Sequence, residues 1–124
     1  MYSISTVPEH RLVRITVTGL LTAGQVEQLY REEHQAIVDM GCALGDHIVL
    51  VDLRDCPIQF QEVVGAFQKN INGEGQARRL AMVTGGSAAR MQARRILKRG
   101  GAHQFDTIAE AEEWLLAPEE RRAA

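Results

Sequence analysis

The stretch 47-HIVLVDLRDCPIQF-60 decides the fold class of this chain. Its residues 48–51 form an unbroken apolar run that leads into Asp52. A short continuous apolar run is typical of a strand that is covered on both faces, as in a parallel sheet. We therefore expect a strand over His47–Leu53 inside an α/β domain.

Four further segments have the composition of strands. Residues 2–7 (YSISTV) and 12–18 (LVRITVT) are rich in β-branched side chains, and the break 8-PEHR-11 between them predicts an antiparallel hairpin. Residues 80–84 and 102–105 are expected to form two short strands further along the chain. The sequence thus predicts five strands.

Helical periodicity fills the gaps between these strands. Thr22 begins a Thr-x-x-Gln capping box, and Gly41 stands where a helix C-terminus favours a left-handed residue. Ser87–Arg99 is a third helix, and Thr107-x-x-Glu110 repeats the capping pattern before the last one. The second helix has an apolar stripe formed by Phe60, Val63, Val64, Phe67 and Ile71, and the last has one formed by Ala111, Trp114 and Leu115.

The expected order is β-β-α-β-α-β-α-β-α, with a five-stranded, mixed but mostly parallel sheet and four helices. Strands that alternate with helices imply right-handed crossovers between parallel neighbours. A chain of 124 residues suits one domain. We expect a single α/β domain over residues 1–117 and a flexible charged tail over 118–124.

Composition indicates a globular protein of the cytoplasm. Hydrophobic residues make up 45% and charged residues 24% of the chain, and no apolar run is long enough to span a membrane. The N-terminus lacks the layout of a secretory signal. Cys42 and Cys56 stand in neither metal nor redox spacing, which is typical of a reducing compartment.

The charges are distributed unevenly, although the net charge is only −2. No acidic residue occurs between Glu74 and Asp106, a segment that carries seven arginines and lysines. In the predicted helix 87–99, one outward row contains Arg90, Arg94 and Lys98. This row could meet an acidic protein, anionic lipid or nucleic acid, or it could be a solvated face paired with acids such as Glu110, Glu112 or Glu113. Nucleic acid is disfavoured, because the segment has no exposed aromatic residues.

The order of elements, with Asp52 inside 48-IVLVDL-53 and the ending 105-FDTIAEAEEWL-115, resembles the STAS fold over nearly the whole chain. More narrowly, it resembles the SpoIIAA-like group, relatives of bacterial anti-sigma-factor antagonists. The resemblance implies that the chain works through a protein partner or its own subunit as a homodimer. It also implies a phosphoacceptor serine at the start of the second helix. Here that region is 58-IQFQEVV-64, and the matching position falls near Gln61.

The phosphorylation switch is not carried over with the resemblance. Neither serine nor threonine occurs anywhere from residue 23 to residue 83. A phosphate would add roughly −1.5 to −2 charge at such a helix start, and this segment has no hydroxyl to accept one.

The acid pair Asp52 and Asp55 is the first chemical candidate, because ligands bind beyond the carboxyl ends of parallel strands. The alternative is structural: Asp52 hydrogen-bonds to nearby backbone and Asp55 makes an Asx-type turn before Pro57. Neither histidine nor serine occurs from residue 48 to residue 60, so we expect no catalytic site and an inert Cys56. We also expect no cofactor and no metal, since His103-x-x-Asp106 is the closest approach to a ligand motif.

The segment 83-VTGGSAAR-90 runs from a strand through two glycines into a helix. Backbone N–H groups at a helix start attract anions, and glycines let a ligand approach. The simpler alternative is a connector in which Ser87 caps the helix.

Two functions remain open, with an enzyme built on Asp52, Asp55 and Cys56 as a third and weaker one. The first is a non-catalytic interaction module. The second is a small-molecule binder for an anionic amphiphile or lipid-like ligand, with Phe60 and Phe67 as pocket walls and Arg90 or Arg94 at the headgroup. A cavity of ~300 Å³ would favour the second. The candidate surface for either function comprises Asp55, Ile58, Phe60, Gln61, Ser87, Arg90, Arg94 and Lys98.

Overall fold

The computed structural model describes residues 1–73 and 76–118. Its sheet has five strands in the order β1-β2-β3-β4-β5. β1 and β2 are antiparallel, and every later pair of neighbours is parallel, which confirms the predicted mixed sheet. The strands are β1 (Tyr2–Val7), β2 (Leu12–Val17), β3 (Ile48–Leu53), β4 (Arg79–Thr84) and β5 (Ala102–Phe105).

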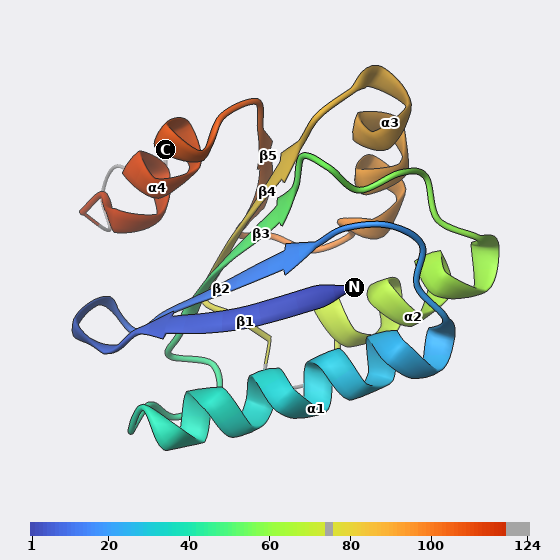
Figure 1. Ribbon diagram of the computed structural model, residues 1–124. Coiled ribbons are helices and arrows are strands. Elements are labelled where there is room, and N and C mark those ends of the chain that lie inside the picture. Colours follow the sequence, from blue (N-terminus) through green and yellow to red (C-terminus); the bar gives the residue numbers. More distant parts are fainter. Residues whose placement is uncertain (74–75, 119–124) are drawn as a thin grey trace.

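Four α-helices cover the two faces of the sheet unequally (Figure 1). Three of them pack on one face around a large apolar core, and α4 alone packs on the other face over a smaller one. The hairpin between β1 and β2 turns through a short 3-10 helix, Pro8–His10. The helices are α1 (Ala23–Asp39), α2 (Gln61–Ile71), α3 (Ser87–Ile96) and α4 (Ile108–Leu116).

β3 is buried on both faces, as its apolar run predicts. Val49 and Val51 belong to the core under α1, α2 and α3, whereas Ile48 and Leu50 belong to the core under α4. Successive side chains of a strand point to opposite faces, so Asp52, the next residue in the even series, lies on the α4 face. The Asp52 carboxylate can therefore contact only groups on the α4 face of the sheet.

Both ends of α1 follow the sequence signals. Thr22 accepts a hydrogen bond from Gln25 N–H at 3.1 Å, and the Gln25 side chain accepts one from Thr22 N–H at 2.8 Å. The reciprocal pair is the predicted capping box. Gly41 follows the helix with φ +78°, a left-handed conformation that glycine adopts without steric cost.

α3 is shorter than predicted, because it ends at Ile96 rather than at Arg99. Two side chains of the α2 region supply donors to its last carbonyls. Gln68 donates to Arg95 O at 2.7 Å, and Asn72 donates to Ile96 O at 3.1 Å. These bonds satisfy acceptors that a further helical turn would otherwise use. Lys98 therefore lies beyond the helix, and the predicted row of three basic residues contains only two.

Two aromatic residues lie differently from the predicted stripes. Phe60 is the N-cap residue of α2 and is exposed, so it is not part of that helix's buried face. Trp114 is half-buried rather than central in the core. Its ring stands edge-on to His103, with ring centroids 4.9 Å apart, and tilted against Phe105 at 5.6 Å. It thus covers the edge strand β5.

Residues 119–124 of the predicted charged tail lie outside the described residues, and Pro118 is exposed. None of the described helices combines the length and apolar character that crossing a membrane requires.

The core under α1 contains two ionisable side chains that are almost fully buried, Glu33 and His47. Both line a small cavity of about 20 Å³ together with Tyr30 and Asn70. Burial raises the pKa of Glu33 from 4.5 to about 7. Burial also lowers the pKa of His47 from 6.5 to about 4, helped by the charges of His34 and Arg99. Both groups therefore favour their neutral forms in the folded protein.

The two shifts predict opposite pH dependences of stability. The folded state holds the Glu33 proton more tightly than the unfolded chain, so the Glu33 contribution falls as pH rises from about 4.5 to 7. The folded state holds the His47 proton less tightly, so its contribution falls as pH drops from about 6.5 to 4. Between about pH 4.5 and 6.5 the contribution of Glu33 falls with rising pH while that of His47 rises, so their pH dependences largely cancel.

Glu33→Gln should remove one side of this balance. Above pH 7 the variant should be more stable than the parent by up to about 3 kcal/mol, because it avoids burying a carboxylate. Near pH 4 the two proteins should be nearly equal, since Glu33 is then protonated in both states. Urea unfolding of both proteins at pH 4 and pH 8 checks this. A difference in unfolding free energy that is the same at the two pH values would contradict it.

Candidate functional site

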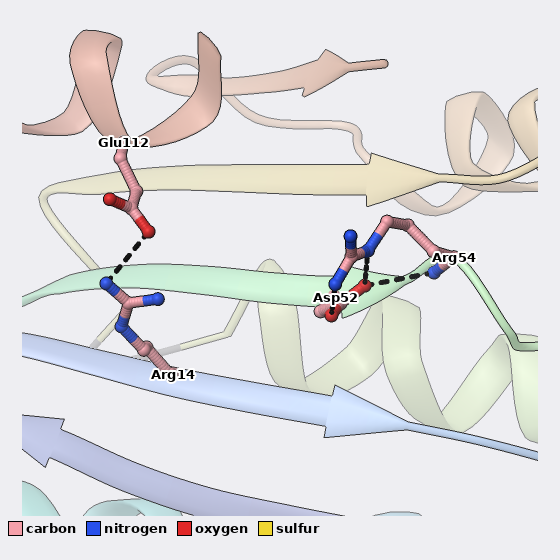
Figure 2. A network of polar contacts seen from close by, with 4 residues as sticks. All are labelled: Arg14, Asp52, Arg54 and Glu112. Atoms are coloured by element: carbon pink, nitrogen blue, oxygen red, sulfur yellow. Dashed lines mark hydrogen bonds and ion pairs between the residues drawn. The ribbon is translucent and has the colours of Figure 1, made fainter. Parts of the chain in front are cut away.

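Asp52 at the end of β3 is held by Arg54, two residues later (Figure 2). Its carboxylate accepts hydrogen bonds from Arg54 N at 3.1 Å, Nε at 3.0 Å and Nη2 at 2.9 Å. These side-chain and backbone bonds lower the pKa of Asp52. The Asp52 carboxylate thus bonds to nearby backbone at the end of the strand, as the structural alternative in the sequence analysis predicts. A carboxylate held by these bonds is poorly suited to accept a proton.

A second ion pair on the same face fastens α4 to the sheet. Glu112 of α4 meets Arg14 of β2 at 2.8 Å (Figure 2). Both side chains are about one-third exposed, so the pair adds on the order of 1 kcal/mol at most. Its position matters more than its strength. Glu112 turns toward β2, so it is not an acid that pairs with the basic helix α3.

The acid pair and Cys56 do not form a catalytic group. Asp55 is exposed and makes no hydrogen bond among the described residues, so the predicted Asx-type turn is absent; its charge acts on Arg54. Cys56 packs against the core on the α2 and α3 face, across the sheet from Asp52. Burial raises the pKa of the Cys56 thiol, which disfavours the reactive thiolate.

Gln59 is the buried polar centre of this end of the sheet. Its Oε1 accepts from Leu21 N at 2.8 Å, and its Nε2 donates to Gly19 O at 2.9 Å and to Pro57 O at 3.0 Å. The backbone of Gln59 is also paired: its N–H donates to Gln92 Oε1 at 2.9 Å, and its carbonyl accepts from Gln92 Nε2 at 3.0 Å. The β2–α1 loop, the β3–α2 loop and α3 are thereby joined.

Exposed apolar side chains stand on the loops that Gln59 joins. Ile58 is 53% and Phe60 is 58% exposed, on either side of the buried Gln59. Leu20, between the two residues that Gln59 contacts on the β2–α1 loop, is 53% exposed. We call Leu20, Ile58 and Phe60 the loop patch. Gln61, the predicted match to the phosphoacceptor position, is the exposed first residue of α2 beside it.

The predicted ligand pocket is not formed behind this patch. An apolar cavity does lie between β3, α2 and α3, but it holds only about 20 Å³, the room of about one water molecule. Phe67 lines it, whereas Phe60 does not. The residues that α3 contributes to its wall are Ala89, Gln92, Ala93 and Ile96.

Arg90 and Arg94 face a different surface of the molecule. They line an open groove of about 280 Å³ beside β5, together with Phe105, Asp106 and Glu110. Arg90 pairs with Asp106 at 2.6 Å, rather than with the acids of α4 that the sequence offered. The predicted single surface is therefore two surfaces on opposite sides of α3, and Lys98 is exposed beyond the helix end.

The Gly-Gly turn before α3 packs closely against a neighbouring loop. Gly86 is the N-cap residue and Ser87 is the exposed first helical residue, so the predicted Ser87 cap is wrong. A Cβ atom on Gly85 would stand 2.2 Å from Arg54 O. The β4–α3 turn thus touches the backbone of the β3–α2 loop, and only glycine fits there.

Sequence reasoning missed Gln59 and the role of Gly85. A glutamine between two apolar residues gives no local sign that it is buried. The Gly-Gly pair indicated a turn, but the sequence did not show that Gly85 is needed because the turn touches another loop. Among residues 1–73 and 76–118, no three histidine, cysteine, aspartate or glutamate side chains gather where they could hold a metal ion.

Comparison with solved structures identifies the fold, while no family model and no curated protein sequence matches the chain. An uncharacterised DUF3478-family protein with a SpoIIAA-like fold from Shewanella loihica PV-4 is 18% identical, with a TM-score of 0.66 over 93% of this chain and 92% of that one. The protein TM1081 gives a TM-score of 0.66 at 16% identity, over 93% and 88%. The anti-sigma factor antagonist SpoIIAA in its unphosphorylated form gives 0.59 at 15%, over 89% and 92%.

These similarities show that the chain has the STAS-type, SpoIIAA-like fold, which confirms the resemblance inferred from the sequence. At 15–18% identity they establish the fold alone.

Gln59→Met should destabilise the protein by about 2–4 kcal/mol, because buried groups such as Leu21 N–H lose their partner. The matched control is Gln61→Met, the same change at an exposed position, with an expected effect within ~0.5 kcal/mol. Urea unfolding of the two variants provides the comparison. Equal midpoints would show that the carboxamide of Gln59 does not join the loops.

Gly85→Ala should cost about 3 kcal/mol, since the added methyl group collides with Arg54 O and one loop must move. Gly86→Ala meets no atom within 4 Å and should cost less than about 1 kcal/mol, mainly as a poorer N-cap. Thermal unfolding of both variants tests the contrast. Melting temperatures that fall equally would show that the contact between Gly85 and Arg54 O does not require a glycine.

Proposed function

We propose that this chain is a non-catalytic interaction module that binds a protein partner through the loop patch. The observation that carries the proposal is the exposure of Leu20, Ile58 and Phe60 on loops that Gln59 holds rigid. Exposed apolar side chains on loops that are bonded to one another offer a surface that a partner can bind. A rigid loop loses little conformational entropy when a partner binds to it.

The similarity to SpoIIAA supports the class of function. That protein is an anti-sigma factor antagonist, a regulator that acts on another protein. In the present chain the corresponding region has no phosphorylatable residue, and Gln61 begins α2. We infer that partner binding does not depend on phosphorylation at the start of α2. The setting of the proposed activity is the cytoplasm of a bacterium.

The geometry of the acid pair supports the absence of catalysis. Asp52 is engaged by Arg54, and Cys56 lies on the other face of the sheet with a thiol pKa raised by burial. The small-molecule alternative has less support, because the apolar cavity behind the patch holds about 20 Å³. Drug-sized ligands occupy cavities of ~300 Å³ or more.

The double variant Ile58→Ser/Phe60→Ser should lose the partner, because it removes the two most exposed apolar side chains of the β3–α2 loop. The matched control is Val38→Ser, which changes an apolar residue of α1 that is 58% exposed, as Phe60 is. Tagged parent, double variant and control are used as baits in cell extract, and the captured proteins are quantified by mass spectrometry. We expect a protein held by the parent and the control but lost, by about tenfold or more, from the double variant.

Sedimentation velocity on the same three proteins separates a foreign partner from a second copy. A dimer that only the double variant dissociates would identify the patch as a homodimer interface, the other form that the interaction module can take. Identical captured proteins and identical sedimentation for all three would overturn the proposal.

A further inference from the structure

The loop patch continues onto one side of α3. The side chain of Gln92 bonds to the backbone of Gln59, which lies between two residues of the loop patch. Arg95 is three positions after Gln92, so both residues lie on the same side of the helix. Met91, four positions before Arg95, is 58% exposed. We call Met91 and Arg95 the α3 flank, because they border the loop patch on its α3 side.

The side of α2 that faces α3 carries no charge. α2 lies beside α3 on the same face of the sheet, and Gln68 donates to Arg95 O at 2.7 Å (Figure 1). Gln61 and Gly65 are seven and three positions before Gln68, so they share its side of α2. Both are exposed. The surface between the two helices therefore combines these neutral residues with the α3 flank.

The acidic residues closest to this surface in the sequence are directed elsewhere. Glu62 is seven positions before Lys69, so the two share one side of α2. Lys69 pairs with Glu27 of α1 at 3.8 Å, which places that side toward α1. Asp55 stands at the β3 end of the β3–α2 loop, where its charge acts on Arg54. We therefore assign neither acid to the surface between α2 and α3.

Arg95 is a positive charge without an acidic partner in the described part of the chain. It is exposed, and among residues 1–73 and 76–118 it forms no ion pair. The one ion pair of α3 within the same ranges joins Arg90 to Asp106 on the β5 side of the helix. Residues 75–105 contain no acid. The α3 flank thus adds one unmatched positive charge to the edge of an apolar surface.

We propose that the protein bound by the loop patch presents a carboxylate beside its apolar side chains. The carboxylate pairs with Arg95, and Met91 extends the apolar contact. A bound partner excludes water from the guanidinium, and an ion pair is stronger in such less polar surroundings. Complementary charges also orient a partner and reject one that has a positive charge at the same place. This inference rests on the function proposed above and specifies the chemistry of its partner.

The same charge argues against a second copy of this chain as the occupant. A two-fold contact brings the same surface of both copies together. That surface holds no acid between α2 and α3, so Arg95 of one copy would meet neutral or positive groups of the other. A foreign protein with an acidic residue matches the charge.

The probe is a library of random peptides displayed on phage and selected on the intact chain of 124 residues. Peptides that also bind Ile58→Ser/Phe60→Ser are discarded, so those that remain require the loop patch. We expect them to combine an aromatic or aliphatic residue with aspartate or glutamate. The most enriched peptide is synthesised, and its affinity is measured by fluorescence polarisation.

Variants of α3 isolate the separate contacts. Arg95→Glu should weaken the enriched peptide about fivefold or more and, used as bait, should select lysine or arginine in place of the acid. The matched control is Arg94→Glu, the same charge change on the next residue, which lines the groove beside β5 together with Asp106 and Glu110. The control should change the affinity less than about twofold. Met91→Ser should lower the affinity without changing the preference for acids.

Salt provides a second readout of the ion pair. Added sodium chloride should weaken binding of the peptide to the parent more than to Arg95→Gln, because salt screens the charge that this variant lacks. Circular dichroism of each variant checks that it is folded, which the exposure of Arg95 leads us to expect.

The outcomes separate this inference from the proposed function. Patch-dependent peptides without acidic residues, or peptides weakened equally by Arg95→Glu and Arg94→Glu, would overturn the inference and leave the loop patch as an interaction site. Recovery of no patch-dependent peptide would contradict both, and Arg95-dependent binding to vesicles that contain phosphatidylserine would then assign the surface to a membrane. A parent dimer that Arg95→Glu dissociates in sedimentation velocity would make a second copy the occupant and also overturn the inference.

Discussion

The end of the sheet that carries the loop patch depends on one buried carboxamide. Gln59 pairs with Leu21 N–H and Gly19 C=O, groups that lie 38 and 40 residues earlier in the chain. Buried backbone groups without partners are costly, so loops are rarely buried. Gln59 removes that cost and lets the β2–α1 loop close over the β3–α2 loop. The side chain of Gln92 in α3 pairs in the same way with the backbone of Gln59. Gly85 allows the β4–α3 turn to touch the β3–α2 loop.

The fold could be predicted from the sequence because its signals are local. The apolar run of β3 specifies burial on both faces, and the Thr22 capping box specifies where α1 starts. Each signal needs only residues within a few positions of each other. The same apolar run placed Asp52 near the carboxyl end of the strand, whereas the face of the sheet on which Asp52 lies became known only from the structure. The order of elements sufficed to identify a fold shared with proteins that are less than 20% identical.

The candidate site could not be predicted to the same extent, because its contacts join distant segments. Phe60 has helical spacing with Val63 and Phe67, which indicates burial, yet it precedes the helix and faces outward. Periodicity gave the outer face of α3 correctly, but it does not reveal which neighbour each side of a helix meets. The helix also ends early, because Gln68 and Asn72 bond to its last carbonyls from another element. No pattern within residues 87–99 carries that information.

α3 has a different neighbour on each of its sides. Its inner side packs toward α2 and bonds to Gln59, and its outer side presents Arg94 to the edge of β5. The C-terminal end of the helix is tied by hydrogen bonds from Gln68 and Asn72, and its middle is tied to the β3–α2 loop through Gln92. A helix held at these points keeps Gln92, and with it the buried Gln59, in a fixed position behind the loop patch.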